Sequence, residues 1–459
     1  MSLTQSHVMN DSILLSLKEF GVAFGDRIIL SSLTMEIPET GIVVVMGPSG
    51  TGKSTLLRSL AGLSAASPSY RTWGSLAFIG APIEQADEAP VLVSQSAKLM
   101  MSSVLENVVS GLPERHTLTQ LEQRELVKRL LCQAGLDALV EQLDQCVVEL
   151  PLGMQRHLAI LRAVASGPKL LCIDEPTTGV DDEDVARILQ YIKNESEKRA
   201  VLIVLHNQRQ AKKLGGQTVL LAGGWVQEMQ PTDNFFAAPK SNPGKDFVRS
   251  GSCVVPSPDA KSEEINNQYK ASVRALPKAA TQFKSHVLGP RGFLWLKKGK
   301  LAGTPKPGLL KELEYDLEAL KRVGVTHLVS LTEKEIDADI CNEMGVEVIR
   351  SPMPDMQAPS NQQAVEICEQ ISALLESSKV IAVHCKAGLG RTGTVLAAQL
   401  IYEGANAINA LEQTRGIEPR WIQSEVQVQF LTEFEYFLKT KGNIENGSDS
   451  PDVSGAANQ

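Results

Sequence analysis

The sequence lacks several features that would assign it to a class of protein at once. No apolar run approaches the ~18 residues that a membrane-spanning helix needs. The first residues, MSLTQSHVMNDS, have neither the basic nor the apolar segment of a secretory signal peptide. The seven cysteines include no Cys-x-x-Cys pair, which argues against a zinc site and a disulfide framework. A basic excess is also missing, because 45 Lys and Arg stand against 53 Asp and Glu, so nucleic acid is not an expected partner. We therefore expect a reduced, cytoplasmic protein.

The apolar content indicates what is present instead. The 459 residues are 43% hydrophobic, which is enough for several cores, and the length favours two to four domains. Short apolar runs at residues 42–46, 170–173, 201–205 and 218–221 alternate with amphipathic segments. Such runs are typical of parallel strands buried on both faces, so we expect an α/β fold.

Changes in composition divide the chain. Residues 12–240 form the first α/β region, and scattered Pro, Ser, Asn and Lys with little periodicity predict a linker over 241–285. A second, smaller α/β domain is expected over 286–440, followed by a polar tail over 441–459. Within this domain the pattern predicts an amphipathic helix over 308–322, strands over 327–331 and 380–383, and a last helix over 425–439. No internal repeat relates the two halves.

The first half contains a glycine-rich loop in the context that phosphate binding requires. The run Gly47-Pro-Ser49-Gly50-Thr-Gly52-Lys53-Ser54-Thr55 follows an apolar strand and opens a helix. Its glycines let successive N–H groups curl around phosphates, and the helix N-terminus adds positive potential. Lys53 can reach the β- and γ-phosphates of a nucleotide, and the Ser54 hydroxyl can ligate Mg²⁺. The alternative, a glycine-rich turn with an incidental lysine, does not explain the residues found downstream.

Polar residues that could complete a nucleotide site follow three other apolar runs. Asp174 and Glu175 end the run that starts at Leu170, where Asp174 would hold Mg²⁺ and Glu175 would polarise the attacking water. Gln95 and His206 end two more runs. Either of these would by itself be an ordinary loop residue, but in this order and spacing both are interpreted as sensors of the γ-phosphate, with Gln95 also at the metal.

On these residues, positions 13–238 resemble an ATP-binding cassette (ABC) ATPase. The resemblance implies a mixed sheet with a helical subdomain, ATP and Mg²⁺ as cofactors, and a homodimer formed through the cassette. It equates Gly47–Thr55 with the Walker A loop, Gln95 with the Q-loop, Asp174-Glu175 with Walker B, Thr178–Asp181 with the D-loop and His206 with the switch histidine. Phe24 lies where the family stacks an aromatic ring on adenine, although it could equally be a core phenylalanine. The segments 103–112 and 227–250 are more similar to importer-type than to exporter-type cassettes.

One motif of the family is degraded. The family places a Leu-Ser-Gly-Gly-Gln signature before a helix, and here Leu150-Pro-Leu-Gly-Met154 stands in that slot. Pro151 supplies neither hydroxyl nor N–H, Leu152 adds bulk, and only Gly153 is retained. We therefore expect ATP binding with slow hydrolysis.

The second half contains a different phosphate-binding pattern, His384-Cys385-Lys-Ala-Gly-Leu-Gly-Arg391-Thr392-Gly393, between an apolar strand and a helix. The amides of a short glycine-rich loop can point at one phosphoryl group, and the same field favours the thiolate of Cys385. The fork of Arg391 can bind two phosphate oxygens. A core cysteine is the alternative, but it explains neither the glycines nor the arginine.

A phosphocysteine mechanism also needs a general acid. Asp337 and Asp339 lie in a polar stretch that is better explained as a solvated helix face. Asp355 lies in a proline-stiffened loop, Pro352-Met-Pro-Asp-Met-Gln-Ala-Pro, which could close over substrate, and we predict that it is the acid. Gln423 is a candidate for orienting water, with a surface glutamine as its rival and Gln427 as a weaker candidate.

Residues 287–438 resemble the dual-specificity branch of the protein-tyrosine phosphatases, and the loop 384–393 is especially similar to that of the mitotic-exit phosphatases. The resemblance implies a phosphoprotein substrate, no metal, and the following site: Cys385 as nucleophile, Arg391 as phosphate binder, Asp355 as acid, Thr392 as a helper of thiolate departure and Gln423 as water orienter. A shallow pocket would also admit phosphoserine and phosphothreonine. Lys386 could attract acidic substrates or inositol phosphates, although a single lysine is usually only solvated.

Three hypotheses for the whole chain remain open at this stage. The first is a phosphoprotein phosphatase whose cassette binds ATP and regulates it or tethers it at the inner face of the membrane through partner subunits. The second is the ATPase of an importer with separate membrane subunits and a regulatory phosphatase. The third is a sensor whose cassette dimerises on ATP.

Overall fold

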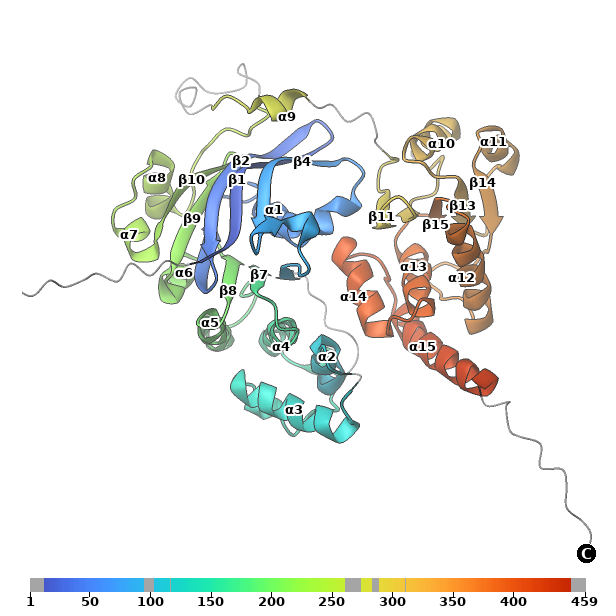
Figure 1. The fold of residues 1–459 in the computed structure, drawn as a ribbon, viewed down its shortest axis with the longest axis horizontal. Helices are drawn as coiled ribbons and strands as arrows, with labels where there is room; N and C mark the ends of the chain where they lie inside the picture. Colours follow the sequence, from blue (N-terminus) through green and yellow to red (C-terminus); the bar gives the residue numbers. More distant parts are fainter. Residues whose placement is uncertain are drawn as a thin grey trace, which may run out of the picture. The chain divides into compact units, whose positions relative to one another are not determined.

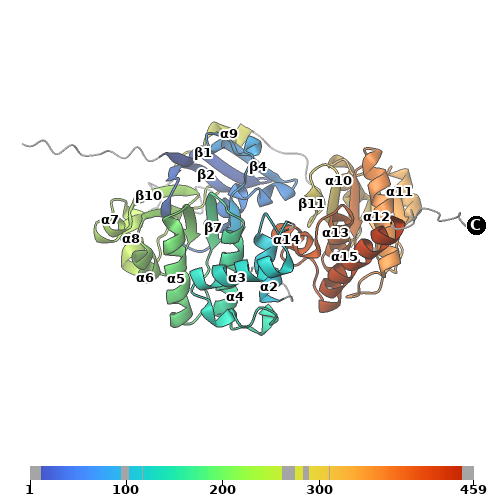
Figure 2. The ribbon, with the colours of Figure 1, turned by 60° about the horizontal axis from the view of Figure 1, so that its bottom comes forward.

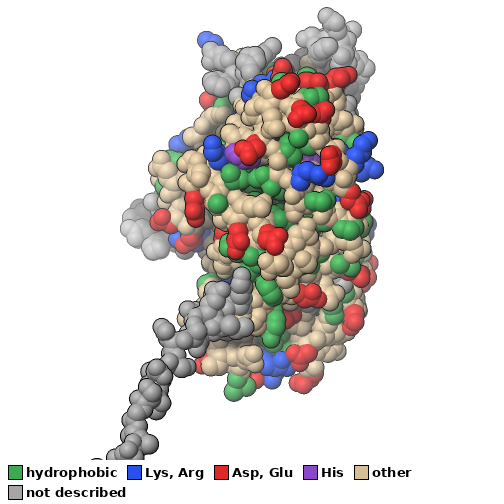
Figure 3. All heavy atoms as spheres, turned by 90° about the vertical axis from the view of Figure 1, so that its right-hand side faces the viewer, with side chains coloured by type: hydrophobic (Ala, Val, Ile, Leu, Met, Phe, Trp, Pro, Cys, Tyr) green, Lys and Arg blue, Asp and Glu red, His purple; other side chains and the backbone are tan. Residues whose placement is uncertain are grey.

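The computed structural model describes residues 12–94, 103–115, 117–260, 274–282, 289–309 and 311–446. These residues fall into two compact units, one formed by residues 12–65 and 69–282 and the other mainly by residues 289–446. Among the described residues, none of the helices combines the length and the apolar character needed to cross a bilayer. On the face drawn in Figure 3, acidic and basic side chains are interspersed and neither sign forms a continuous field.

The first unit is built on a mixed ten-stranded sheet with the order β5-β4-β1-β2-β10-β9-β3-β8-β7-β6 (Figure 1). Its antiparallel strands are β1 (Ile13–Phe24), β2 (Arg27–Pro38), β4 (Tyr70–Phe78) and β5 (Ala81–Pro82). Strands β3 (Gly41–Met46), β8 (Ala200–Val204), β7 (Leu170–Asp174) and β6 (Val91–Val93) are mutually parallel, while β9 (Gln217–Ala222) is parallel to β3 and pairs antiparallel with β10 (Trp225–Pro231). Every residue of β7 and β8 is buried, as expected for strands covered on both faces.

Helices cover this sheet and form a separate group at one end of the unit. Figure 2 shows α2 (Val104–Gly111), α3 (Gln120–Gln133) and α4 (Leu152–Ala165) gathered together. Helices α2 and α3 each begin with a capping box, from Ser103 with Glu106 and from Thr119 with Glu122, so both start points are encoded locally. The remaining helices are α1 (Lys53–Leu60), α5 (Asp182–Ser196), α6 (Gln208–Leu214), α7 (Thr232–Ala237), α8 (Asn242–Ser250) and α9 (Lys278–Gln282).

The structure differs from the sequence prediction at the start of the expected linker. Residues 242–250 form α8, whose Phe247 is fully buried in the core of the first unit. The Glu228 carboxylate accepts the backbone N–H groups of Lys240 at 2.7 Å and Ser241 at 2.8 Å, which fixes the approach to this helix. The sequence pattern did not predict this helix because its apolar side chains that pack on the core, Phe247 and Val248, are adjacent and too few to show a repeat along the chain.

The second unit contains a five-stranded sheet with the order β11-β12-β15-β13-β14. Strands β12 (Leu301–Thr304), β15 (Ile381–His384), β13 (His327–Ser330) and β14 (Glu347–Arg350) are parallel, and β11 (Leu294–Lys297) is an antiparallel edge. A layer of helices covers each face of this sheet. On one face, Ala302, Leu328 and Ala382 of the strands pack against α10 (Leu313–Arg322) and α11 (Ala338–Glu343). The other layer consists of α12 (Asn361–Glu376), α13 (Gly390–Tyr402), α14 (Ala407–Ile417) and α15 (Glu425–Asn446).

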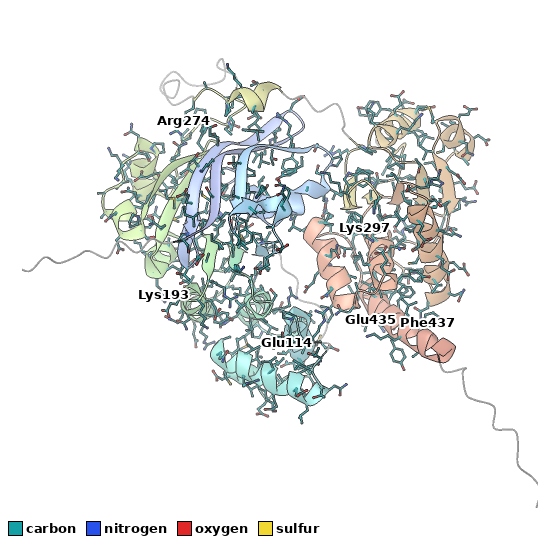
Figure 4. The ribbon with its side chains drawn as sticks, in the orientation of Figure 1. Glu114, Lys193, Arg274, Lys297, Glu435 and Phe437 are labelled. Atoms are coloured by element: carbon teal, nitrogen blue, oxygen red, sulfur yellow. The ribbon has the colours of Figure 1, made fainter. Side chains whose placement is uncertain are left out.

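Two polar contacts hold the ends of this second layer, and both involve residues labelled in Figure 4. Lys297 of β11 forms an ion pair with Glu403, just after α13. Glu435 of α15 accepts the N–H of Ala407 at 2.7 Å, in the first turn of α14.

Two helices have different bounds from those predicted. Helix α10 begins at Leu313 rather than at Gly308, because Gly308 has a φ of +78° and its N–H is bound by Asp316 at 3.0 Å. Helix α15 continues to Asn446, beyond the predicted end at 439 and into the expected tail.

Candidate functional site

The first candidate site lies where parallel strands of the first unit end together. Strands β3, β8, β7 and β6 are neighbours, so their carboxyl ends meet at one edge of the sheet. The glycine-rich loop follows β3 and His206 follows β8, while Asp174 is the last residue of β7 and Glu175 comes directly after it. Gln95, predicted after β6, lies outside the described residues. The parallel arrangement of these strands therefore brings the loop, both carboxylates and the histidine together at the carboxyl edge of the sheet.

Close packing requires a glycine at the first position of the loop. Gly47 has a φ of +150°, and a Cβ atom there would lie 2.0 Å from the Leu221 carbonyl oxygen. The loop wraps around the buried Lys53, whose ammonium donates to the carbonyl oxygens of Gly47 at 2.9 Å and Pro48 at 2.7 Å. Burial lowers the pKa of Lys53, against the opposite effects of Glu175 and Asp174. The two carbonyl oxygens thus fix the Lys53 ammonium group inside the loop, where it can contact a phosphate.

Asp174 provides the test of whether a divalent cation fits. It is buried, and burial raises its pKa above the ordinary range of a carboxyl group, although a hydrogen bond from Ser54 acts in the other direction. Its Oδ1 atom has no hydrogen-bond partner among the described residues. A hydroxyl beside a buried carboxylate with a free oxygen is a donor set suited to Mg²⁺, which takes few protein ligands and completes its shell with phosphate and water.

Glu175 and His206 are already in contact, since the carboxylate forms a hydrogen-bonded pair with His206 Nε2. Glu175 has a positive φ of 49°, an unusual conformation for a side chain of this size. Together with the loop they enclose a cavity of about 340 Å³, lined by Arg27, Ile29, Ser49, Gly50, Gly52, Lys53, Ser54, Thr55, Glu175 and His206. Phe24 does not line this cavity, and its ring packs 5.6 Å from that of Tyr70.

The degraded signature lies at the start of α4. Pro151 is the residue before the helix and provides no side-chain cap, and the exposed Leu152 is its first residue. Gly153 is buried where a Cβ atom would lie 2.0 Å from the Asp184 carboxylate, which explains why this glycine is present. The helix therefore begins without the hydroxyl that the signature of the family supplies.

The second candidate site is the loop of residues 386–389 between β15 and α13. Four N–H groups, from Lys386 to Leu389, have no acceptor among the described residues, so they are free to meet an anion. Gly388 has a φ of +71° and packs so tightly that a Cβ atom would lie 2.5 Å from the Pro305 nitrogen. The indole N–H of the buried Trp421 donates to the Gly388 carbonyl oxygen at 3.0 Å. The loop is thus held in one shape before any ligand binds.

Cys385 lies at the base of this loop and is almost fully buried. Two neighbouring polar atoms have no partner in the described part of the chain, Thr392 Oγ1 and His384 Nε2. His384 Nδ1 lies 3.1 Å from the Cys385 carbonyl oxygen, and burial lowers the pKa of His384 to about 4, so the ring is neutral at pH 7. The Thr392 hydroxyl, in the first turn of α13, therefore remains available to a ligand.

Arg391 and Asp355, predicted as phosphate binder and acid, form an ion pair with Nη2 and Oδ1 2.8 Å apart. The guanidinium is fixed from behind, because Nη1 donates to the carbonyl oxygens of Met353 at 2.9 Å and Leu331 at 3.4 Å. The arginine side chain is only 5% exposed, whereas that of Asp355 is 70% exposed. The pair therefore joins a rigid cation to an acid on an exposed loop.

Gln423 and Gln427 have different surroundings. Both side chains lie beside the start of α13, since a Cβ atom added at Gly390 would lie 3.1 Å from Nε2 and Oε1 of Gln427 and 3.2 Å from Oε1 of Gln423, but only Gln423 is exposed. The buried Gln427 accepts the N–H of Gln423 at 2.8 Å and donates to the Gln357 carbonyl oxygen at 3.2 Å. Gln427 thus links the Gln423 segment to the loop that carries Asp355.

Sequence reasoning missed two lysines at this site. A cavity of about 440 Å³ is lined by Lys306, Gly308, Leu309, Thr332, Glu333, Lys334, Asp355, Lys386 and Arg391. Lys306 and Lys334 follow β12 and β13, parallel neighbours of β15, and this position at strand ends was the signal that could have found them.

Comparisons with known proteins give a separate match for each of the two units. A family model described as "ABC transporter" matches residues 30–178, and one described as "Polymorphic toxin system, DSP-PTPase phosphatase" matches residues 302–405. The phosphate import ATP-binding protein PstB 3 of Natronomonas pharaonis is 32% identical over 247 residues, which cover 52% of this chain and 89% of that protein. PstB 2 of Shouchella clausii is 29% identical over 243 residues, covering 51% and 90%. A solved structure of cbiO1 from Clostridium perfringens is 23% identical, covers 52% of this chain and 96% of its own, and has a TM-score of 0.44.

The chain therefore belongs to the ATP-binding cassette family through its first unit. It also carries a second, smaller α/β unit that matches the phosphatase family model. The predicted fold class and both family resemblances are confirmed.

Proposed function

We propose that this chain is bifunctional, binding ATP in the first unit and hydrolysing phosphomonoesters through Cys385 in the second. The observation that carries the phosphatase is the convergence of four free loop amides, a nearly buried arginine and a loop-borne carboxyl group next to one cysteine. A core cysteine would need none of these.

The reaction follows from the atoms available. The Cys385 thiolate attacks phosphorus while the loop amides and Arg391 hold the other phosphate oxygens. The P–O bond to the leaving group breaks as Asp355 delivers a proton to that oxygen. A water molecule then attacks the phosphorus of the phosphocysteine while Asp355 accepts a proton from this water. The P–S bond breaks, the Cys385 thiolate is restored and inorganic phosphate leaves. In this proposal Gln423 orients this water, and Thr392 Oγ1 donates to the departing sulfur.

The ion pair of Arg391 with Asp355 implies that the substrate phosphate binds before Asp355 acts on the leaving group. A phosphate dianion that enters the loop competes with Asp355 for the same Nη2 group. Because the guanidinium is fixed by two carbonyl oxygens and Asp355 is exposed, Asp355 is the partner that moves. Substrate binding thus frees the exposed Asp355 carboxylate, which takes up a proton from solvent and then donates it to the leaving oxygen.

Hydrolysis of p-nitrophenyl phosphate in the presence of EDTA tests the phosphatase. We expect turnover by the wild-type protein, and none by Cys385→Ser, because a serine hydroxyl is poorly ionised at neutral pH. Cys132→Ser, which changes an exposed cysteine of the first unit, is the matched control and should retain activity. Full activity of Cys385→Ser would refute the assignment.

In the cassette, Lys53 and the N–H groups of residues 49–52 would hold the phosphates of ATP, and Ser54 and Asp174 would hold Mg²⁺, with Gln95 expected beside them. When bound, Mg²⁺ neutralises phosphate charge during the transfer. Glu175 would accept a proton from the attacking water, and its contact with His206 supports this role by orienting the carboxylate. Hydrolysis is proposed to be slow, because Pro151 and Leu152 replace the donors that a homodimer would present to the opposite nucleotide.

A second candidate function is favoured by the relatives that the first unit matches. Two of them are phosphate import ATP-binding proteins, and the match covers 89% and 90% of their lengths. In this alternative the cassette drives import by separate membrane subunits, which would place the chain at the inner face of the membrane, and the phosphatase regulates transport. Copurification of such subunits would support it, whereas a free ATP-dependent dimer would support a sensor.

A further inference from the structure

The rim of the phosphatase pocket carries more positive charge than one phosphate group needs. The four free loop amides and Arg391 would be sufficient to bind a single phosphoryl group. Three lysines, Lys306, Lys334 and Lys386, line the same cavity from three separate segments of the chain. They lie after β12, after β13 and in the loop after β15, so the parallel sheet itself brings them together.

The backbone fixes the position of Lys306. Its ammonium group donates to the carbonyl oxygens of Lys334 and Glu335, both at 3.1 Å, and its N–H donates to the Lys386 carbonyl oxygen at 3.2 Å. Burial, and then the neighbouring Lys334, lower the pKa of Lys306. An ammonium group has three N–H donors, so one is left for a ligand.

The carboxylates nearby are largely occupied. Glu335 forms an ion pair with Arg350, and Asp355 pairs with Arg391. Within the described part of the second unit, none of the three lysines has a carboxylate partner, and Glu333 is the remaining acidic residue of the cavity wall. The cavity therefore presents unneutralised ammonium groups beside its phosphate loop.

The size of the cavity limits which anion can meet them. All three lysines belong to the wall of one space of about 440 Å³, which is typical of small-molecule sites. A second phosphate group on the same small molecule would lie within this space while the first occupies the loop. The flanking acidic side chains of a peptide would be spaced along an extended chain instead, at ~3.3–3.6 Å per residue.

Building on the proposed phosphatase activity, we propose that the substrates are small organic polyphosphates of the inositol-polyphosphate class. One phosphate group enters the loop of Cys385, and a second meets Lys306, Lys334 and Lys386. Each turnover consumes one water, breaks one P–O ester bond and releases one inorganic phosphate, and the product keeps the remaining phosphate groups.

The test compares kcat/KM for four substrates of the full-length protein: myo-inositol hexakisphosphate, p-nitrophenyl phosphate, a singly phosphorylated tyrosine peptide with acidic neighbours, and phosphatidylinositol bisphosphate in phosphatidylcholine vesicles. We expect the ratio of kcat/KM for inositol hexakisphosphate to that for p-nitrophenyl phosphate to exceed one. It should fall about fivefold in Lys334→Met and in Lys386→Met, and further in the double variant, as loss of an exposed charge pair implies. Lys298→Met, an exposed lysine in the turn before β12 at the opposite end of that strand, is the matched control and should keep the wild-type ratio.

The outcomes separate this inference from the proposed function. No phosphate release from any substrate would overturn both. Hydrolysis of p-nitrophenyl phosphate with a ratio that the double variant leaves unchanged, or a preference for the peptide, would overturn the polyphosphate inference alone. A preference for inositol hexakisphosphate in solution, or for the lipid in vesicles, would each support it and would identify the source of the headgroup.

Discussion

Replacing Asp355 with asparagine should separate its two contacts, one with Arg391 and one with the leaving group. The variant loses the proton donor, so kcat for a phosphoserine peptide should fall ~10² or more, the usual contribution of a general acid. It also loses the ion pair that competes with phosphate for Arg391. Because the Asp355 side chain is 70% exposed, that pair contributes about 1 kcal/mol or less, so inorganic phosphate should bind at most about fivefold more tightly.

The measurement is kcat for two substrates together with the inhibition constant for inorganic phosphate. With p-nitrophenyl phosphate the fall in kcat should be much smaller than with phosphoserine, because p-nitrophenolate is a weak base and leaves without a proton. Asp339→Asn is the matched control, since this exposed carboxylate in the first turn of α11 was the rival acid in the sequence. Equal losses for both leaving groups, or weaker phosphate inhibition, would refute the assignment of Asp355 as acid and as competitor for Arg391.

Three further predictions concern the cassette. ATP with Mg²⁺ should raise its Tm, and Lys53→Ala should remove that shift because the ammonium group is the principal cation at the loop; a shift that persists would place the nucleotide elsewhere. Pro151→Ser with Leu152→Gly should accelerate ATP hydrolysis by restoring donors that are typically worth ~10² to 10³ in rate, and brisk wild-type turnover that the double variant leaves unchanged would contradict this. Burial raises the pKa of Asp174, so its ionised form costs stability at pH 7, and that cost disappears as pH falls through the raised value. Asp174→Asn should therefore raise the nucleotide-free Tm at pH 7 and less so toward pH ~4; a gain that does not change with pH would point to another cause.

How far the sequence could predict this molecule depended on the range of the interactions involved. Walker A, the Asp174-Glu175 pair and the loop of Cys385 are local patterns in which a strand, a turn and a helix follow one another. The order of the parallel strands then brings these patterns together, so the fold class and both families could be predicted. Helix α8 could not, because its position depends on one buried phenylalanine and on the distant carboxylate of Glu228.

The same distinction applies within the phosphatase site. Asp355 could be chosen from its proline-stiffened loop, but its pairing with Arg391 depends on tertiary packing. Lys306 and Lys334 are separated from Cys385 by 79 and 51 positions in the printed sequence and belong to no motif. Only the register of β12 and β13 beside β15 shows that they line one cavity with Lys386 and Arg391, which belong to the segment that follows Cys385.

The contact between Trp421 and the phosphate loop also provides an optical reporter of that loop. The buried indole ring donates to Gly388, and its Cβ atom lies so close to α13 that a Cβ atom at Gly393 would approach it to 2.5 Å. Indole emission responds to nearby charge and to changes at the ring N–H, so an oxyanion entering the loop would alter the fluorescence of Trp421. The chain has four tryptophans, and replacing Trp73, Trp225 and Trp295 with phenylalanine would leave a single signal. Occupancy of the phosphatase site could then be followed in real time in the intact chain while nucleotide is added to the cassette.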